Sequence, residues 1–543
     1  MRIRKLLRVR FVVYSFTEQE KIMAELTPMM QKYMETKEQY KDCILFYRLG
    51  DFYEMFFDDA IVASKELEIA LTGKSCGLEE RAPMCGIPYH AVETYLARLV
   101  SRGYKVAICE QVEDPKLAKG LVKREVIRVV TPGTNLDVQS LEASKNNYLM
   151  CIAYTSDGIG ISAADVTTGD YYVTEVEDLR KLKDELMKYE PSEIICNEAF
   201  LVSGYDVEDL KSRLHMSVSS LESHMFDDDG CRRILMRHFK VNTLIGLGVE
   251  EFPTGILAAG ALLQYLYDTQ KTDLEHFTHI SPYLTSKYML LDSSTRRNLE
   301  LTETLREKQK RGSLLWVLDK TKTAMGGRLL RNYIEQPLID KEEMEKRLDA
   351  IQELNQDSIS RDEIREYLNP VYDLERLLSK VTYKTANPRD LIAFRNSLQM
   401  LPPIKTVLAG FQKEELAAIR EEIDGLEDIY QLIDEAIVEE PPISIREGGM
   451  IKDQFDETID HLRAAKHDGK QWLVQLEEED RERTGIKNLK IKKNNVFGYF
   501  FEVTNSYKDL VPEDYIRKQT LANAERYTTP RLKELEDTIL NAE

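Results

Sequence analysis

The chain has 543 residues, of which 43% are hydrophobic, enough for about three or four domains with cores of their own. Its formal net charge of −20 excludes a uniformly basic protein, so contacts with nucleic acid must come from local basic patches. The seven cysteines include no Cys-x-x-Cys pair, which indicates reduced thiols rather than disulfides or a zinc site. No apolar run approaches the ~20 residues of a membrane span, so we expect no membrane partner.

The first 22 residues are basic and contain one short apolar piece at residues 11–14. They lack the apolar core and the small-residue cleavage site of a secretion signal. We therefore expect residues 1–22 to be a disordered extension that comes from an upstream start codon or from cloning. A secretion signal is the alternative.

A strand and turn at residues 43–54 form the stretch around which the sequence is organised. Residues 43–48 have the pattern of a buried strand, and Gly50-Asp51 is a turn pair. In extended backbone Phe52 and Glu54 share a face. A ring exposed there could enter a stack of bases, and a carboxylate, which phosphates repel, fits only as a partner for a base edge. The alternative is a core aromatic beside a solvated glutamate.

Three segments carry a close resemblance to the bacterial MutS mismatch-recognition family. They are Gly-Asp-Phe-Tyr-Glu-Met-Phe at residues 50–56, Gly-Ile-Pro-Tyr-His-Ala-Val at 86–92 and Val-Ala-Ile-Cys-Glu-Gln at 106–111. The resemblance continues from about Met23 to the last residue. It implies that Phe52 is a wedge beside the mismatched base and that Glu54 hydrogen-bonds to that base.

The resemblance also implies a multidomain fold, α/β followed by all-α. The expected parts are a mixed α/β mismatch-recognition domain over residues 23–135, a ribonuclease-H-like α/β connector over 136–254, a helical core and lever over 255–469 and 530–543, and an inserted β-hairpin clamp over 470–529.

In the first domain, Asp58-Asp59 is expected to cap a helix. Residues 73–75 read Gly-Lys-Ser, but a P-loop needs a further glycine at position 68, which is Glu68. The resemblance makes Lys74 a phosphate contact and Met84 a groove contact, with ordinary solvated roles as the alternatives.

The connector shows three predicted strands at 149–154, 159–166 and 171–176, then a helix to residue 189 and a strand at 194–196. This order resembles the ribonuclease-H-like fold and raises a metal-dependent nuclease as the alternative function. That chemistry needs clustered carboxylates with one on the first strand, and residues 149–154 contain none. The resemblance implies a connector that docks a MutL-type partner.

From about Gly255 the chain is predicted to be helical, and segments 291–300, 326–330 and 373–376 are interpreted as helix caps and packing faces. One long helix, the lever, is expected from Ile451 to about Thr484, on the order of 50 Å at 1.5 Å per residue. Beyond it we predict strands at 486–491 and 496–503, joined by residues 492–495, and a helix over 515–527.

The end of the lever reverses the charge of the chain. Residues 481–533 hold 12 Lys or Arg against 6 Asp or Glu, a balance of +6. This favours sequence-neutral phosphate contact over the alternative of a solvated face. Through the resemblance, the predicted groove and backbone contacts of this region are Lys492, Lys493, Asn494, Lys518 and Asn523.

A last helix is predicted to begin at Thr529-Pro530. The family continues with an ATPase domain, and no P-loop occurs in these 543 residues, so we expect a truncated, non-enzymatic, monomeric chain. Full-length members form homodimers, and ATP and Mg²⁺ are expected only in the missing domain; we expect no cofactor in this chain. The predicted function is to bind mismatched or looped-out bases in double-stranded DNA, in the bacterial cytoplasm at the nucleoid, and so to initiate mismatch repair.

Overall fold

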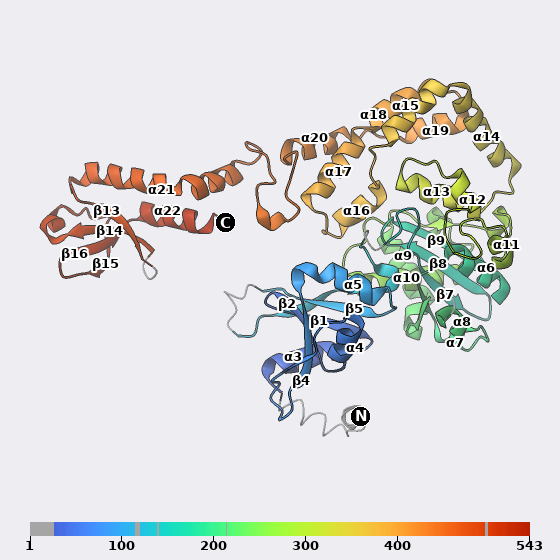
Figure 1. The fold of residues 1–543 in the computed structure, drawn as a ribbon, viewed down its shortest axis with the longest axis horizontal. Helices are drawn as coiled ribbons and strands as arrows, with labels where there is room; N and C mark the ends of the chain where they lie inside the picture. The colour runs from blue at the N-terminus through green and yellow to red at the C-terminus, as the bar shows by residue number, and fades with distance from the viewer. Residues whose placement is uncertain are drawn as a thin grey trace. The chain divides into compact units, whose positions relative to one another are not determined.

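The computed structural model describes residues 26–113, 120–137, 141–212, 214, 216–494 and 498–542. The extension predicted over residues 1–22 lies outside them. The chain divides into two compact units, Met1–Glu427 and Asp428–Glu543 (Figure 1). In the described part of the chain, no helix combines the length and the apolar character needed to cross a membrane.

The first domain is a six-stranded mixed sheet with helices on both faces (Figure 1). Its order is β3-β4-β2-β1-β5-β6, in which β1 pairs antiparallel with β2 and parallel with β5. Side chains of β1 are buried on both faces of the sheet, which explains its continuous apolar run. The strands are β1 (Cys43–Leu49), β2 (Phe52–Phe56), β3 (Thr72–Lys74), β4 (Ala82–Pro88), β5 (Lys105–Gln111) and β6 (Arg124–Val130).

Alternate side chains of this sheet pack against different helices. Ile44 and Phe46 join one core with α4 (Phe57–Leu67) and α5 (Val92–Val100). Leu45 and Tyr47 join another with α3 (Pro28–Gln39). The β2 residues on the α3 face are Phe52, Glu54 and Phe56, and only Phe56 belongs to that core.

Asp59 does not have the predicted role of a helix cap. The N-cap of α4 is Phe56, which makes no side-chain cap. The carboxylate of Asp59 is instead buried, where it accepts a hydrogen bond from the Leu45 amide at 2.9 Å and pairs with Lys37 at 2.9 Å. A buried carboxylate is held where most of its acceptors are satisfied, and these partners come from elements distant in sequence.

The second domain contains a six-stranded sheet of order β11-β10-β7-β8-β9-β12. The predicted meander is present as β7 to β9, which are antiparallel, while β10 and β11 run parallel to β7. The strands are β7 (Leu149–Tyr154), β8 (Ile159–Asp165), β9 (Asp170–Val176), β10 (Glu193–Cys196), β11 (Ser217–Ser220) and β12 (Ser281–Pro282). The helices are α6 (Leu179–Tyr189), α7 (Glu198–Leu201), α8 (Val207–Ser212), α9 (Asp228–His238) and α10 (Pro253–Gln270).

Helix α10 belongs to the core of this second domain. Its buried residues Ile256 and Leu263 share a cluster with Val173 of β9. A Cβ atom on Gly160 of β8 would lie 1.9 Å from the Thr254 carbonyl oxygen, so glycine permits the close approach of α10. The boundary predicted between residues 254 and 255 therefore cuts through a packed helix. The sequence did not reveal this, because an apolar helix that covers this sheet has the same pattern as a helix in the core of the helical region.

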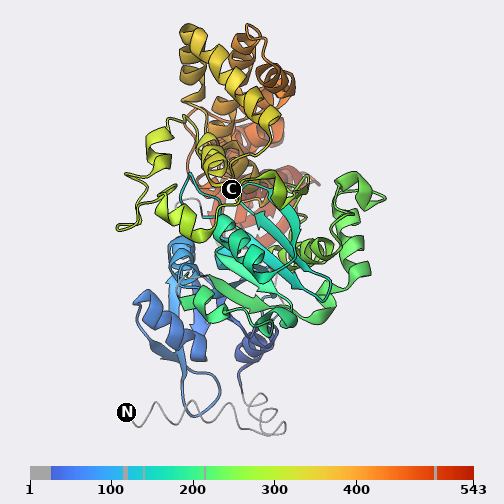
Figure 2. The ribbon, with the colours of Figure 1, turned by 90° about the vertical axis from the view of Figure 1, so that its right-hand side faces the viewer.

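The rest of the first unit is mainly helical, as predicted. Asp292 and Asp373 cap α11 and α16 with their side chains, in agreement with the interpretation of segments 291–300 and 373–376. The cap of α13 is Thr323, which lies before the interpreted segment 326–330. Side chains of α14, α15, α18 and α19 share one small core, and these helices lie together among the yellow to orange helices of Figure 2. The helices are α11 (Ser293–Asn298), α12 (Leu314–Leu318), α13 (Ala324–Glu335), α14 (Lys341–Gln356), α15 (Ser358–Leu368), α16 (Leu374–Thr382), α17 (Pro388–Leu398), α18 (Leu401–Leu408) and α19 (Glu414–Glu422).

The second unit contains the long helix α21 (Glu457–Thr484), a four-stranded sheet and two further helices, α20 (Glu427–Ala436) and α22 (Pro530–Asn541). Helix α21 has 28 residues and begins later than predicted, because the Asp456 side chain caps it at the Ile459 amide. At 1.5 Å per residue it is about 42 Å long. Gly485, with φ +70°, ends it in the left-handed conformation that favours glycine.

The helix predicted over residues 515–527 is wrong. The segment forms two strands of the antiparallel sheet β13-β14-β16-β15. Tyr515 and Tyr527 pack with Phe501 in the core of this sheet, and that packing overrides the helical pattern. The strands are β13 (Lys490–Asn494), β14 (Gly498–Thr504), β15 (Ile516–Thr520) and β16 (Ala524–Thr528).

Candidate nucleic-acid interface

The turn between β1 and β2 is fixed from both sides. Gly50, with φ +60°, supplies its left-handed residue. The Arg48 side chain donates a 2.5 Å hydrogen bond to the Gly50 carbonyl, and its guanidinium lies 3.8 Å from the centre of the Tyr89 ring. The Tyr89 amide donates to the Asp51 carbonyl at 3.0 Å. The residue that follows this turn, Phe52, therefore starts from a well-supported backbone.

Phe52 is exposed at this tip. It is the first residue of β2, opposite Leu49 on one side and Pro88 on the other, and it retains 47% of its accessible surface. Among the described residues, no aromatic ring stacks on it. The alternative of a core aromatic beside a solvated glutamate does not fit the structure, because Phe52 is exposed and Glu54 is largely covered.

Glu54 is paired with Lys74. The Lys74 ammonium lies 2.5 Å from Oε2 of Glu54 and 5.5 Å from the centre of the Phe56 ring. Lys74, the predicted phosphate contact, is thus paired with Glu54, the predicted partner of the mismatched base. Met84, the predicted groove contact, is half-buried on β4 beside Phe56.

Glu110 of β5, which was not predicted as a site residue, stabilises the strands that carry this turn. The Tyr53 hydroxyl donates to the Glu110 carboxylate of β5, which also accepts from Arg48 at 3.3 Å. Burial and this hydrogen bond raise the pKa of Tyr53 above its ordinary value. Glu110 lies inside the 106–111 motif, but nothing in that motif indicates a partner on a neighbouring strand.

A second cluster of predicted contacts lies on the sheet of the second unit. Lys492 and Lys493 are on strand β13, whereas they were predicted in the connection between two strands. Lys492 pairs with Glu502 at 2.7 Å, and the Lys493 ammonium lies 5.0 Å from the Tyr499 ring centre. Asn494, half-buried, is the last residue of the same strand.

Lys518 is the predicted contact with the freest charge. It is exposed at an irregularity in β15, between Arg517 and Gln519, and makes no ion pair among the described residues. Asn523 is exposed in the turn before β16, where its carbonyl accepts from the Asn505 amide at 3.2 Å. Three further exposed lysines, Lys487, Lys490 and Lys533, also make no ion pair in the described chain. Their sequence carries no signal that distinguishes them from other surface lysines.

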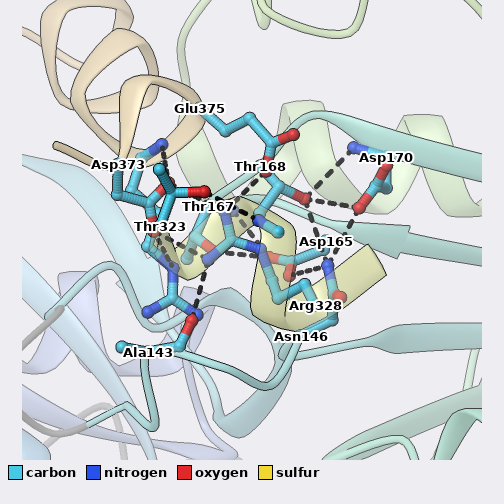
Figure 3. Close-up of polar contacts among 12 residues, drawn as sticks. Ala143, Asn146, Asp165, Thr167, Thr168, Asp170, Thr323, Arg328, Asp373 and Glu375 are labelled. Carbon is cyan, nitrogen blue, oxygen red and sulfur yellow. Dashed lines mark hydrogen bonds and ion pairs between the residues drawn. The ribbon is translucent and has the colours of Figure 1, made fainter. Parts of the chain in front are cut away.

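A polar cluster joins the second domain to the helical region (Figure 3). Arg328 of α13 makes two 2.7 Å hydrogen bonds with Asp373, a third of 2.6 Å with Glu375, and donates to the Ala143 carbonyl at 2.9 Å. The cluster connects helices α13 and α16 with the segment that leads into β7.

The acids at the ends of β8 and β9 lie in this cluster and are occupied by protein donors (Figure 3). Asp165 accepts from the Thr167 hydroxyl at 2.7 Å and from Asn146 at 2.9 Å, and Asp170 accepts from the same Asn146 amide group at 2.9 Å. Across the described ranges, no group of three or more His, Cys, Asp or Glu side chains is placed to hold a metal ion. The nuclease alternative has no support here.

The two α/β domains, the helical region and the long helix with its small sheet define a modular multidomain protein, and three family models match successive parts of it. MutS domain I matches residues 27–139, MutS domain II matches 147–280 and MutS domain III matches 294–541. The chain belongs to the MutS family. The domain II match extends past α10, as the packing of that helix requires.

Curated relatives agree along almost the whole chain. The DNA mismatch repair protein MutS of Lachnoclostridium phytofermentans is 66% identical over 521 residues, which are 96% of this chain and 56% of the relative. The proteins of the same name from Ruminiclostridium cellulolyticum and Acetivibrio thermocellus are 55% and 54% identical, and the match covers 96% of this chain and 60% of each relative. The chain thus spans little more than half the length of these relatives.

Proposed function

We propose that this chain recognises mispaired or looped-out bases in duplex DNA and so serves the start of mismatch repair. The observation that carries the proposal is Phe52, an aromatic ring 47% exposed on a braced β-turn, in a chain whose relatives are named for mismatch repair. An apolar ring that enters a base step unstacks it at a cost of roughly a few kcal/mol, and that cost is least where the bases are already mispaired.

Glu54 supplies the second half of the recognition. It lies two residues beyond Phe52 on the same face of β2, so both can reach one base step. A carboxylate accepts hydrogen bonds and repels phosphate, so it is compensated only where a base edge offers a hydrogen. A mispaired base, which has lost its partner, offers such an edge.

The sheet of the second unit is the proposed backbone contact. Phosphates carry no sequence information, and a lysine without an ion pair can release a counterion when it binds one. Lys518 meets this condition in the structure, whereas Lys492 is offset by Glu502. We also propose contacts by Lys493 and Asn494, which lie on strand β13 of this sheet, and by Asn523, which lies in the turn before β16.

The remaining roles rest on family membership. The strand order of the second domain is consistent with a ribonuclease-H-like connector, which we propose docks a MutL-type partner. We propose that the chain acts by binding rather than catalysis, since the matched family models are MutS domains I to III. We further propose that ATP with Mg²⁺ and homodimer formation depend on the part of the longer relatives that this chain does not match. The proposed location is the cytoplasm, at the nucleoid.

The test compares fluorescent duplexes of one sequence that are perfect, singly mispaired or carry one unpaired nucleotide. At a fixed salt concentration we expect tighter binding to the two imperfect duplexes and no cleavage of any duplex with Mg²⁺. Equal affinity for all three would contradict the proposal. Magnesium-dependent cleavage would restore the nuclease alternative.

A further inference from the structure

Lys74 and Glu54 form a partly buried ion pair. The ammonium of Lys74 is bound on one side by Oε2 of Glu54 at 2.5 Å and lies 5.5 Å from the Phe56 ring centre. The side chains keep 34% and 17% of their accessible surface, so the pair is partly removed from water. Contacts with a carboxylate and an aromatic ring restrict the conformations of the Lys74 side chain.

The Lys74 side chain reaches Glu54 across one intervening strand. Lys74 lies on β3 and Glu54 on β2, with β4 between them. The β4 residue opposite Glu54 is Gly86, where a Cβ atom would lie 3.6 Å from Cγ of Glu54 and 3.3 Å from the Tyr53 carbonyl oxygen. Gly86 therefore places no side chain on β4 next to the carboxylate.

From this geometry we propose that Lys74 is the positioning residue of Glu54, and that through Glu54 it determines how well the chain distinguishes mispaired from perfect DNA. This inference rests on the proposed function and replaces the expectation that Lys74 is simply a phosphate contact. The ion pair uses Oε2 of Glu54, and Oε1 has no partner among the described residues. The pair thus fixes the side chain while one oxygen stays available to a base.

Two physical effects follow from the pair. A glutamate whose rotamer is already fixed loses less conformational entropy when it binds a base, which favours the mispaired duplex alone. The Lys74 charge also offsets the repulsion between Glu54 and phosphate, which acts on every duplex. The fixed rotamer of Glu54 therefore changes the ratio of the affinities for mispaired and perfect duplexes. A direct contact between Lys74 and phosphate would leave that ratio unchanged.

The experiment measures this ratio, the homoduplex Kd divided by the mismatch Kd, for Lys74→Met in the wild-type chain and in the Glu54→Gln background. We expect Lys74→Met alone to lower the ratio by about threefold to tenfold, the range for releasing one side chain from a fixed rotamer. In the Glu54→Gln background we expect no further change in the ratio. Lys74→Arg should restore it, because a guanidinium can bind the same carboxylate.

A matched control is Lys65→Met, since Lys65 is an exposed lysine of α4 with no ion pair among the described residues. It should leave the ratio unchanged, and thermal unfolding should show that all variants are folded. Equal weakening of both duplexes by Lys74→Met would overturn the proposal in favour of a phosphate contact. An equal loss of ratio in both backgrounds would show that Lys74 does not act through Glu54. The wild-type ratio and that of Phe52→Ala test the proposed function separately.

Discussion

The guanidinium of Arg328 forms two parallel hydrogen bonds with the carboxylate of Asp373, each 2.7 Å long, and Arg328 retains only 3% of its accessible surface. A planar fork that meets a carboxylate in this way is among the stronger polar contacts in proteins. The contact joins α13 to the start of α16, and a further Arg328 hydrogen bond, to the Ala143 carbonyl, reaches the segment before β7. The polar cluster therefore holds the helical region to the second domain.

The first prediction concerns this contact. Asp373→Ala leaves the Arg328 charge buried with the half-exposed Glu375 as its one anionic partner among the described residues, so we expect a loss of about 3 kcal/mol in the free energy of unfolding. Denaturant titration measures it. The matched control is Asp357→Ala, which removes an exposed cap of α15 without a buried arginine and should cost about 1 kcal/mol. Equal losses in the two variants would show that the Arg328 contact adds nothing.

The second prediction concerns pH. His276 is 7% exposed, and burial lowers the pKa of its imidazole from 6.5 to about 4. Between these values the unfolded chain binds the proton and the folded chain does not, so stability should fall as the pH drops from 6.5 toward 4. The full difference is about 3 kcal/mol at 1.36 kcal/mol per pKa unit.

Unfolding titrations at several pH values check this in His276→Leu, in which the extra loss over that window should disappear. His224→Gln is the control, because the His224 side chain is 72% exposed. An unchanged pH profile in His276→Leu would refute the assignment.

The third prediction separates two lysines of the small sheet. Lys518→Ala should weaken binding to perfect and mispaired duplexes together, and make the slope of log K against log salt shallower by about 0.9 for each phosphate that the chain no longer neutralises. Lys492→Ala should change the slope less, because Glu502 already offsets that charge. Salt titrations of both variants decide the matter, and equal slope changes would count against the distinction.

Much of the first site could be predicted from the sequence because it is local. The features that define it come from a few neighbouring residues. Gly50 makes the turn, and the alternation of side chains in β2 puts Phe52 and Glu54 on one face. The partners of these residues could not be predicted. Lys74 and Glu110 reach the site from other strands, and strand order depends on the whole sheet.

The same limit explains two errors in the elements. Residues 515–527 form strands rather than the predicted helix, because Tyr515 packs on Phe501 of β14 and the segment pairs with β14 through β16. Helix α10 was assigned to the wrong domain because its apolar face does not reveal which sheet it covers. Buried polar contacts between domains could not be predicted from the sequence pattern either. An example is the ion pair of Glu193 in β10 with Lys105 in β5, at 3.4 Å.

The most direct test of the account is the affinity of Phe52→Ala for perfect and singly mispaired duplexes at several salt concentrations. In the proposed role Phe52 acts on base stacking, and its ring carries no charge, so its removal should bring mismatch affinity down toward homoduplex affinity with little change in the salt slope. The exposed position of the ring makes a folding defect in this variant unexpected, and thermal unfolding checks that point. Full discrimination by Phe52→Ala would contradict the wedge assignment on which the account depends.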